Sequence, residues 1–593
     1  MEQSPDQPQT DPTAEAFAAF QTWTRLFGKA QQLSHEFWMR QKPQVDSTEP
    51  DPLGLWSAWA QVAAGLANNP EKLGQMQAQF LKDSVKLWQS FLQPGDGQTA
   101  ADGNGRDRRF SAPEWQENAL FAFVKQSYLL TSDYLMQMVD SVDNIDPKVK
   151  AKAEFYTRQF IDAMSPTNFA ATNPDVLRKI AETKGQSLLA GFEHLLNDLE
   201  RGRITMTDEK AFEVGVNVAA TPGKVVFENR LFQLIQYTPT TETVHDIPIL
   251  FFPPWINKFY ILDLTEKKSL VRYLLDAGFT VFMTSWVNPD SSLRNATFSD
   301  YLIEGELKAL EVAAQICNVK AVHTVGYCVA GTALAALLAY LHATKQQAKV
   351  ASATFLTAQV DFADAGDLGI FVDEQQLDTL ERLSEEHGYL DGSYMATTFN
   401  MLRANELIWN YVVSNYLLGN DPMQFDLLYW NSDATRLPMA MHLYYLRNMY
   451  LKNALVQPGA LTVNDTPIDL RKVKTPTYVQ AGKEDHIAPA RSVIKITKYF
   501  KGPLRFILAG SGHIAGVINP PSAQKYQYWT AETLPETIEE FQAQATEHKG
   551  SWWPDWLDWL KPLSGKQVPA RIPGTADLPV IEDAPGRYVK ARC

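Results

Sequence analysis

A glycine-flanked cysteine is the first place in the chain where residue types and spacing suggest chemistry. Cys328 follows the apolar, β-branched run 321–327 and precedes small residues that include Ala330 and Gly331. A strand, a tight turn and a helix in this order form a nucleophile elbow, which strains the backbone of the nucleophile and needs small neighbours. The helix N-terminus would favour the thiolate. The alternative is a buried core cysteine, because short Gly-x-Cys patterns are common and structural cysteines are usually inert.

An acid and a histidine follow in the order that a nucleophile elbow requires. The strand-like run 474–480 ends shortly before Asp485, and the run 504–508 ends shortly before His513, which glycines bracket. A glycine-bracketed histidine in a loop is a poor choice for core packing. With all three residues at strand ends, the sequence predicts a catalytic triad of Cys328, Asp485 and His513.

Length and composition indicate a globular protein with more than one folding unit. The chain has 593 residues, too many for one core, with 45% apolar and 21% charged residues. Its formal net charge of −14 argues against nucleic acid as the main partner. Three scattered cysteines favour a reducing compartment over a disulfide framework or a zinc cage. No signal peptide and no long apolar run are evident, so we expect no transmembrane segment.

Residues 13–203 are predicted to form a helical N-terminal domain. Residues 1–12 are polar and contain proline, so we expect a disordered start. Aromatic residues recur at helical spacing in 13–40 and 53–92, which predicts amphipathic helices that pack on each other or bind an apolar partner. A stretch near 93–109 has the composition of a linker. Three further helices are expected at 117–142, 147–164 and 173–200.

From residue 204 to 593 strands and helices alternate, which predicts an α/β fold with a parallel sheet and right-handed crossovers. The alternation lapses over 362–456, between the nucleophile and the acid. We expect an aromatic-rich lid there, which would cover the active site and exclude water, with a simple structural elaboration as the alternative. Four tryptophans at 552–559 pack on the core or touch an apolar partner, and a proline-rich tail covers about 564–593.

Six long motifs occur in a specific order. They are Pro253-Pro-Trp-Ile-Asn-Lys258, Gly326-Tyr-Cys-Val-Ala-Gly331, Phe425-Asp-Leu-Leu-Tyr-Trp-Asn431, Gly482-Lys-Glu-Asp-His486, Ser511-Gly-His-Ile-Ala-Gly-Val-Ile-Asn-Pro-Pro521 and Gly550-Ser-Trp-Trp-Pro554. With these motifs the chain resembles the class I polyhydroxyalkanoate synthases from about Phe110 to Lys590. Two positions depart from the family: Ala330 stands where glycine is usual, and Trp255 where a smaller or different residue stands. The resemblance implies an α/β-hydrolase fold with a lid insertion, preceded by an all-helical N-terminal domain.

The resemblance also implies a reaction. The substrate would be an (R)-3-hydroxyacyl-CoA, and the product a polyester formed with release of CoA. Cys328 would attack the thioester carbonyl while His513 takes its proton. The backbone N–H of Val329, with one from Trp255 or Ile256, would stabilise the oxyanion, and each such donor is worth about 3 kcal/mol.

Several further expectations rest on the same resemblance. Asp485 would orient His513 or activate the hydroxyl of the acyl acceptor directly. Arg403 and Trp430, both in the predicted lid, would contact the substrate or the closed lid. No cofactor is expected beyond the CoA of the substrate. We also expect a homodimer in the cytoplasm, attached to the growing polyester chain and to the surface of polyester granules.

Two other functions remain open. A cysteine-dependent intracellular esterase or depolymerase would share the fold and differ only in the acyl acceptor, so the fold alone does not separate it from a synthase. A non-catalytic granule-coating protein would use the amphipathic N-terminal helices. The complete triad of residues counts against that second alternative.

Overall fold

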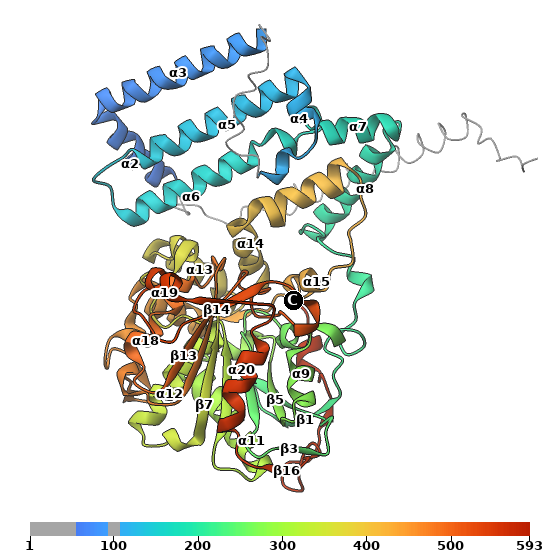
Figure 1. Cartoon of the computed structure of the whole chain (residues 1–593), viewed down its shortest axis with the longest axis vertical. Helices are drawn as coiled ribbons and strands as arrows, with labels where there is room; N and C mark the ends of the chain where they lie inside the picture. Colours follow the sequence, from blue (N-terminus) through green and yellow to red (C-terminus); the bar gives the residue numbers. More distant parts are fainter. Residues whose placement is uncertain (1–54, 93–106) are drawn as a thin grey trace, which may run out of the picture. The chain divides into compact units, whose positions relative to one another are not determined.

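The computed structural model describes residues 55–92 and 107–593 (Figure 1). Three predictions fall mainly on the remaining residues. The disordered start at 1–12, the amphipathic helix at 13–40 and most of the linker near 93–109 lie outside the described residues. They stay predictions.

The described chain forms two compact units. The helical unit comprises the described residues up to Asp208, together with Arg403–Met423. The sheet unit comprises Glu209–Leu402 and Gln424–Cys593. The range 362–456, which we expected to form a lid, is therefore divided between the two units.

Helices with polar caps build the helical unit. They are α2 (Leu55–Ala67), α3 (Pro70–Leu92), α4 (Glu114–Glu117), α5 (Ala119–Asp140), α6 (Pro147–Ala163), α7 (Pro174–Glu182) and α8 (Gln186–Arg201). The side chains of Asn118, Asp146 and Asn173 accept backbone N–H bonds at the starts of α5, α6 and α7. Proline opens both α6 and α7, where its missing N–H costs nothing.

One face of α3 packs on α5. The rings of Trp88 and Phe91 both lie 4.7 Å from the ring of Phe123. The same side of α3 also carries Leu81 and Leu92, because their spacing of seven and four residues from Trp88 follows the helical repeat, and they are 62% and 69% exposed. Packing on α5 thus covers the apolar face of this amphipathic helix only in part.

The single helix predicted over 173–200 is wrong, because the structure has two helices there. Lys184 and Gly185 separate α7 from α8 and adopt positive φ angles of 51° and 84°. Glycine takes up this left-handed conformation at no steric cost, so the chain can turn at that point.

The segment Arg403–Met423 belongs to the helical unit through its contacts with α8. It contains two π-helical stretches, η10 (Asn405–Trp409) and η11 (Val412–Leu417). The Tyr416 hydroxyl donates to Asp198 at 2.6 Å. A backbone carbonyl of the same segment lies 3.1 Å from the ring of His194. These polar contacts come from residues more than 200 positions apart in the chain.

An eleven-stranded sheet organises the second unit. Its order is β15 (Thr546–Lys549), β14 (Gln527–Thr530), β13 (Leu504–Ala509), β12 (Thr477–Gly482), β7 (Val350–Leu356), β6 (Val322–Tyr327), β4 (Ile249–Phe252), β5 (Val281–Trp286), β2 (Phe232–Tyr237), β1 (Gly223–Glu228) and β17 (Glu582–Asp583). The six strands from β13 to β5 pair in parallel, as predicted. The strands outside them pair antiparallel, which the alternation of elements did not predict.

Helices cover both faces of this sheet, because the central strands are apolar on both sides. One core contains α11 (Lys308–Cys317) and α12 (Val329–Ala343), and the other contains α9 (Leu270–Asp276) and α20 (Trp553–Leu560). In Figure 1, α9 and α20 lie in front of the strands. A continuous helix runs through α10 (Phe298–Asp300), the π-helical η7 (Tyr301–Leu307) and α11.

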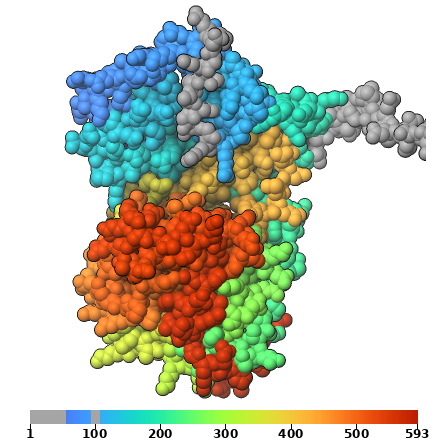
Figure 2. Space-filling view, in the orientation of Figure 1, coloured from blue at the N-terminus to red at the C-terminus, as the bar shows by residue number. Residues whose placement is uncertain are grey.

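Three of the four C-terminal tryptophans pack on the core, and Trp559 is partly buried. Trp552, Trp553 and Trp556 are at most 1% exposed. The indole N–H of Trp556 donates to the Thr354 hydroxyl of β7 at 3.0 Å. The red C-terminal part of the chain covers this face of the unit in the space-filling view (Figure 2). Within residues 55–92 and 107–593, no helix has the length and apolar character needed to cross a membrane.

Candidate active site

Cys328 sits at the turn between β6 and α12. Its backbone adopts φ 53° and ψ −126°, a strained conformation for a residue with a side chain. The Cys328 N–H donates to the Leu356 carbonyl of the neighbouring strand at 3.0 Å, which holds the turn in place. The side chain is half-buried, and the positive end of α12 begins at the next residue, Val329. This is the geometry of a nucleophile elbow.

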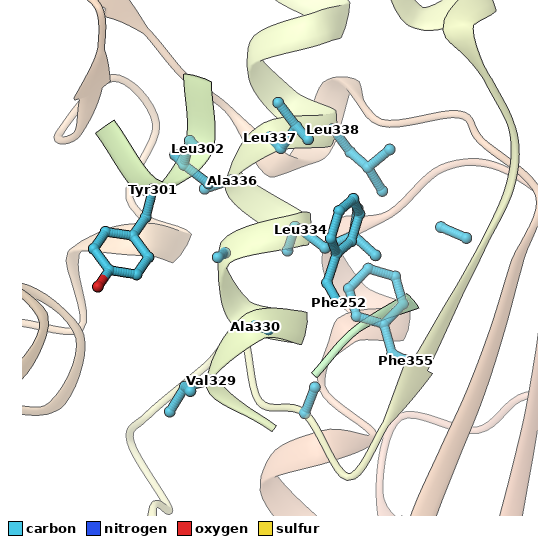
Figure 3. Close-up of a cluster of buried hydrophobic side chains, with 14 of the residues drawn as sticks. Phe252, Tyr301, Leu302, Val329, Ala330, Leu334, Ala336, Leu337, Leu338 and Phe355 are labelled. Carbon is cyan, nitrogen blue, oxygen red and sulfur yellow. The ribbon is translucent and has the colours of Figure 1, made fainter. Parts of the chain in front are cut away.

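Small residues allow α12 to approach β6 closely. A Cβ at Gly326 would lie 2.6 Å from the Gly331 Cα, and a Cβ at Gly331 would lie 2.4 Å from the Ala358 Cβ. Ala330 is fully buried, and Figure 3 shows it in the first turn of α12, on the same side of the sheet as Phe252. Both glycines are therefore required where the sequence indicated a tight turn, and alanine fits at position 330.

His513 and Asp485 lie in the loops that follow β13 and β12. The carboxylate of Asp485 accepts from His513 Nδ1 at 2.7 Å and from two backbone N–H groups, of Ile487 and Ala488, both at 2.9 Å. Three backbone N–H or ring donors fix this carboxylate in one orientation. Asp485 and His513 are 7% and 8% exposed, so little water competes with the contact.

The loop that carries His513 is tied down at three carbonyls. The Tyr327 hydroxyl, next to the nucleophile, donates to the His513 carbonyl at 3.1 Å. The indole N–H groups of Trp552 and Trp553 donate to the following Gly516 and Val517 carbonyls at 2.8 and 2.9 Å. The Tyr327 hydroxyl and the two indole N–H groups thereby hold the loop that places the imidazole relative to Cys328.

The electrostatics of the triad favour an ion pair. Burial alone would lower the pKa of His513, but the negative charges of Asp485 and Cys328, with hydrogen bonds to both, raise it from 6.5 to about 10. Since Nδ1 bonds to Asp485, Nε2 is the ring nitrogen left for Cys328. A protonated His513 held between Asp485 and Cys328 can supply a proton to a leaving group, and in its neutral form it can take the proton of the Cys328 thiol.

Backbone N–H groups for an oxyanion are available on two sides of Cys328. Val329 opens α12, so its N–H has no partner within the helix. The second candidate is the segment 253–258 that follows β4, which we call the β4 loop. In the part of the chain that the structure describes, neither the Trp255 N–H nor the Ile256 N–H has a hydrogen-bond acceptor.

Trp255 lies inside an aromatic cluster. Its ring is 4% exposed and lies 5.2 Å from the ring of Tyr301, 6.1 Å from Trp286 and 6.2 Å from Tyr445. Figure 3 shows Tyr301 beside the first turns of α12. The bulk of Trp255 is therefore accommodated within this buried cluster.

The two residues predicted in the lid lie in different units. Trp430, in α15 (Asp426–Ser432), is 4% exposed, and its indole N–H donates to the Lys258 carbonyl of the β4 loop at 2.7 Å. Arg403 belongs to the helical unit, where it pairs with Glu406 at 3.0 Å. The structure thus places Trp430 against the β4 loop, and the contacts with substrate or closed lid expected of Trp430 and Arg403 stay predictions.

Two tyrosines near Cys328 were not identified from the sequence. Tyr445, in α16 (Met439–Tyr445), donates to the Thr332 hydroxyl of α12 at 3.1 Å. Burial is the main cause that raises the pKa of Tyr445 and of Tyr450, and the charge of Cys328 contributes for both. Aromatic richness over 362–456 was the only sequence signal for them, and it does not distinguish these two from their neighbours.

No cluster of three or more His, Cys, Asp or Glu side chains fit to hold a metal ion occurs within residues 55–92 and 107–593. The expectation that the chain works without a cofactor stays a prediction. The chemistry available from the described residues is nucleophilic acyl transfer by cysteine, with a histidine for proton transfer and backbone N–H groups for the oxyanion.

Comparison with known proteins agrees with this chemistry. Residues 106–274 match the family model described as the N-terminus of poly-beta-hydroxybutyrate polymerase, and residues 247–520 match the alpha/beta hydrolase fold, which confirms the predicted fold. The chain is 47% identical to a poly(3-hydroxyalkanoate) polymerase of Methylorubrum extorquens, over 90% of this chain and 89% of that protein. It is 46% identical to a poly(3-hydroxyalkanoate) polymerase subunit of Cupriavidus necator, over 89% of this chain and 90% of that one.

Proposed function

The chain belongs to the poly(3-hydroxyalkanoate) polymerase family, and we propose that it polymerises (R)-3-hydroxyacyl-CoA through an acyl-Cys328 intermediate with release of CoA. The observation that carries this mechanism is the contact of one buried imidazole, that of His513, with both Cys328 and Asp485. Acyl transfer needs a nucleophile, a proton carrier and an orienting acid in that arrangement.

In the first half-reaction the Cys328 thiolate adds to the thioester carbonyl of the substrate. The carbonyl oxygen becomes an oxyanion, held by the Val329 N–H and an N–H of the β4 loop. When the carbon–sulfur bond to CoA breaks, the CoA sulfur leaves with the proton of the His513 imidazolium. The products are an acyl thioester on Cys328 and free CoA.

In the second half-reaction a hydroxyl group attacks the acyl-Cys328 thioester. The neutral His513 removes the proton of that hydroxyl, and Asp485 stabilises the imidazolium that forms. An ester bond forms, and the Cys328 thiolate is restored beside the charged imidazole. The raised pKa of His513 suits the proton transfer in this direction, because the imidazolium is the favoured state next to the thiolate.

Cysteine suits a polymerase because exchange of one thioester for another is nearly isoenergetic. The acyl group keeps its driving force on Cys328 until a hydroxyl accepts it, provided that water is kept away. Tyr445 and Tyr450 contribute to the buried surroundings of the thiolate, and Trp430 closes the β4 loop on one side. These contacts favour elongation over hydrolysis.

Partners follow from the same premise. The growing polyester chain, the granule surface and a second copy of the chain are the partners that we propose, and the granule in the cytoplasm is the proposed location. The exposed side chains of Leu81 and Leu92 on α3 offer a described surface for an apolar partner. A cysteine esterase of the same fold is the competing function, and it differs in the fate of acyl-Cys328.

The test measures CoA release from (R)-3-hydroxybutyryl-CoA and sizes the acyl product in the same reaction. The wild type should release CoA and form high-mass polyester, and Cys328→Ala should do neither. Cys317→Ala is the matched control, because it makes the same substitution at another cysteine of the sheet unit, the buried Cys317 of α11. Free 3-hydroxybutyrate in place of polyester would establish the esterase instead, and CoA release by Cys328→Ala would contradict the mechanism.

A further inference from the structure

The β4 loop takes its shape from a residue far along the chain. The hydroxyl of Thr435 lies 2.5 Å from the Trp255 carbonyl oxygen and 2.6 Å from the Ile256 carbonyl oxygen. The Thr435 backbone N–H also donates to the Ile256 carbonyl, at 3.2 Å. One residue thus supplies hydrogen bonds to two successive carbonyls of the loop.

Holding a carbonyl fixes the direction of the N–H in the same peptide unit. A peptide unit is planar and trans, so its C=O and N–H point to opposite sides. The Trp255 carbonyl and the Ile256 N–H belong to one such unit. Because Thr435 holds the carbonyl, the Ile256 N–H must point away from Thr435, and the described residues offer it no acceptor. Of the two donors that the sequence left open, Ile256 is thus the one whose N–H direction Thr435 holds.

The contact between Thr435 and the β4 loop is buried, and neighbouring contacts also hold the loop. Thr435 is 2% exposed, so water cannot replace its hydroxyl without opening the site. The next residues pair as well, because Asn257 and Ala434 form an antiparallel β-bridge. Further along the loop, the buried Lys258 ammonium donates to the Ala591 carbonyl at 2.5 Å. The loop therefore has one well-defined conformation around Ile256.

We propose that Thr435 is a positioning residue that aims the Ile256 N–H at the oxyanion formed on the substrate. Thr435 does not touch the reacting atoms itself. The inference rests on the proposed acyl transfer and deepens it, because it assigns the second oxyanion donor and the group that orients it. A misdirected donor lowers the rate of the chemical step while substrate binding persists, since the oxyanion exists only in the transition state and the tetrahedral intermediate.

Three variants test this role. Thr435→Val keeps the shape of the side chain and removes the hydroxyl, whereas Thr435→Ser keeps the hydroxyl. Thr477→Val is the matched control, because Thr477 is also buried in the sheet unit and donates to a backbone carbonyl, that of Thr475 at 2.9 Å. We expect Thr435→Val to lower kcat about 10- to 100-fold with KM within about twofold, and Thr435→Ser to restore kcat to within about threefold. Thr477→Val should keep kcat within about twofold.

A second readout separates positioning from a general structural role. Alkylation of Cys328 by iodoacetamide needs the thiolate but forms no oxyanion, so its rate should stay within about twofold in Thr435→Val. Peptide mass spectrometry distinguishes this site from the exposed Cys593. If Thr435→Val is poorly folded, Thr435→Ala is measured in the same way.

The outcomes are distinct. A wild-type kcat in a folded Thr435→Val or Thr435→Ala protein would overturn the inference, and so would an equal loss of alkylation and turnover. No rescue by Thr435→Ser would also overturn it, since the hydroxyl is the group that carries the argument. Failure of the proposed function shows differently: the wild type itself would release no CoA, or would release it without forming polyester.

Discussion

Replacing Gly331 by alanine should separate the nucleophile from its oxyanion donors. The new Cβ would lie 2.4 Å from the Ala358 Cβ and 3.0 Å from the Gly326 carbonyl oxygen. Ordinary contacts begin near 3.4 Å, so the overlap with the Ala358 methyl is about 1 Å. A methyl group attached to the backbone cannot rotate away. The first turn of α12 must therefore move away from Ala358, which follows β7, and to a smaller extent from β6, and this movement shifts the Val329 N–H relative to Cys328.

The magnitude has a structural part and a catalytic part. Overpacking a buried site costs about 1–3 kcal/mol in free energy of unfolding. A displacement of about 1 Å at a reacting group lowers the rate of catalysis about 100-fold. Gly331→Ala should thus lower the melting temperature and reduce the initial rate of CoA release about 100-fold. The clash is local, so the protein should remain folded.

The assay compares Gly331→Ala with a glycine that has room for a side chain. Gly369 belongs to the same unit, and a Cβ there would have no atom within 4 Å. Gly369→Ala makes the same chemical change and should leave both the melting temperature and the CoA release unchanged. If Gly331→Ala behaved like Gly369→Ala, the close packing of the first turn of α12 against Ala358 and β6 would not be what positions Cys328.

Two other predictions follow from buried charges. Both carboxylate oxygens of Glu306 lack a hydrogen-bond partner among the described residues, and burial raises the pKa of Glu306 well above 4.5. Above pH 4.5 the unfolded chain loses a proton that the folded protein keeps, so stability falls by about 1.4 kcal/mol per pH unit until the folded pKa is reached. Glu306→Gln should gain stability over the wild type as pH rises from 4.5 to 7 in denaturant titrations, and a gain independent of pH would contradict this cause. Asp485→Asn should lower the pKa of His513 from about 10, because the charge of Asp485 is the main cause that raises it. Its kcat should fall about 10⁴-fold, with slower alkylation of Cys328 at pH 7; unchanged alkylation would show that His513 remains charged without Asp485.

The triad was predictable because its signals are local. Cys328, Asp485 and His513 each follow a strand-like run within a few residues, and glycines mark the turns. The parallel part of the sheet was predictable for the same reason. The break at Gly185 was missed, although a glycine can end a helix, because apolar residues keep a helical spacing on both sides of it.

Other features depend on contacts between distant parts of the chain. Thr435 stands 180 residues from Trp255, and nothing in its immediate sequence distinguishes it from other threonines. The strands β14 and β15, at one end of the sheet, have four residues each, too short for a clear alternation of apolar and polar residues. The helical contacts of Tyr416 with Asp198 span 218 residues, so the sequence could not assign the segment Arg403–Met423 to the helical unit.

The most direct test of the account uses an acyl-CoA without a 3-hydroxyl group. Butyryl-CoA can acylate Cys328, but the resulting acyl group cannot serve as an acceptor for chain growth. The account predicts release of about one equivalent of CoA for each active site, with a stable butyryl group that peptide mass spectrometry locates on Cys328. Cys328→Ala should show neither the CoA nor the adduct. Continuous CoA release with free butyrate would contradict the account, because it would show that water, and not a chain hydroxyl, accepts the acyl group from Cys328.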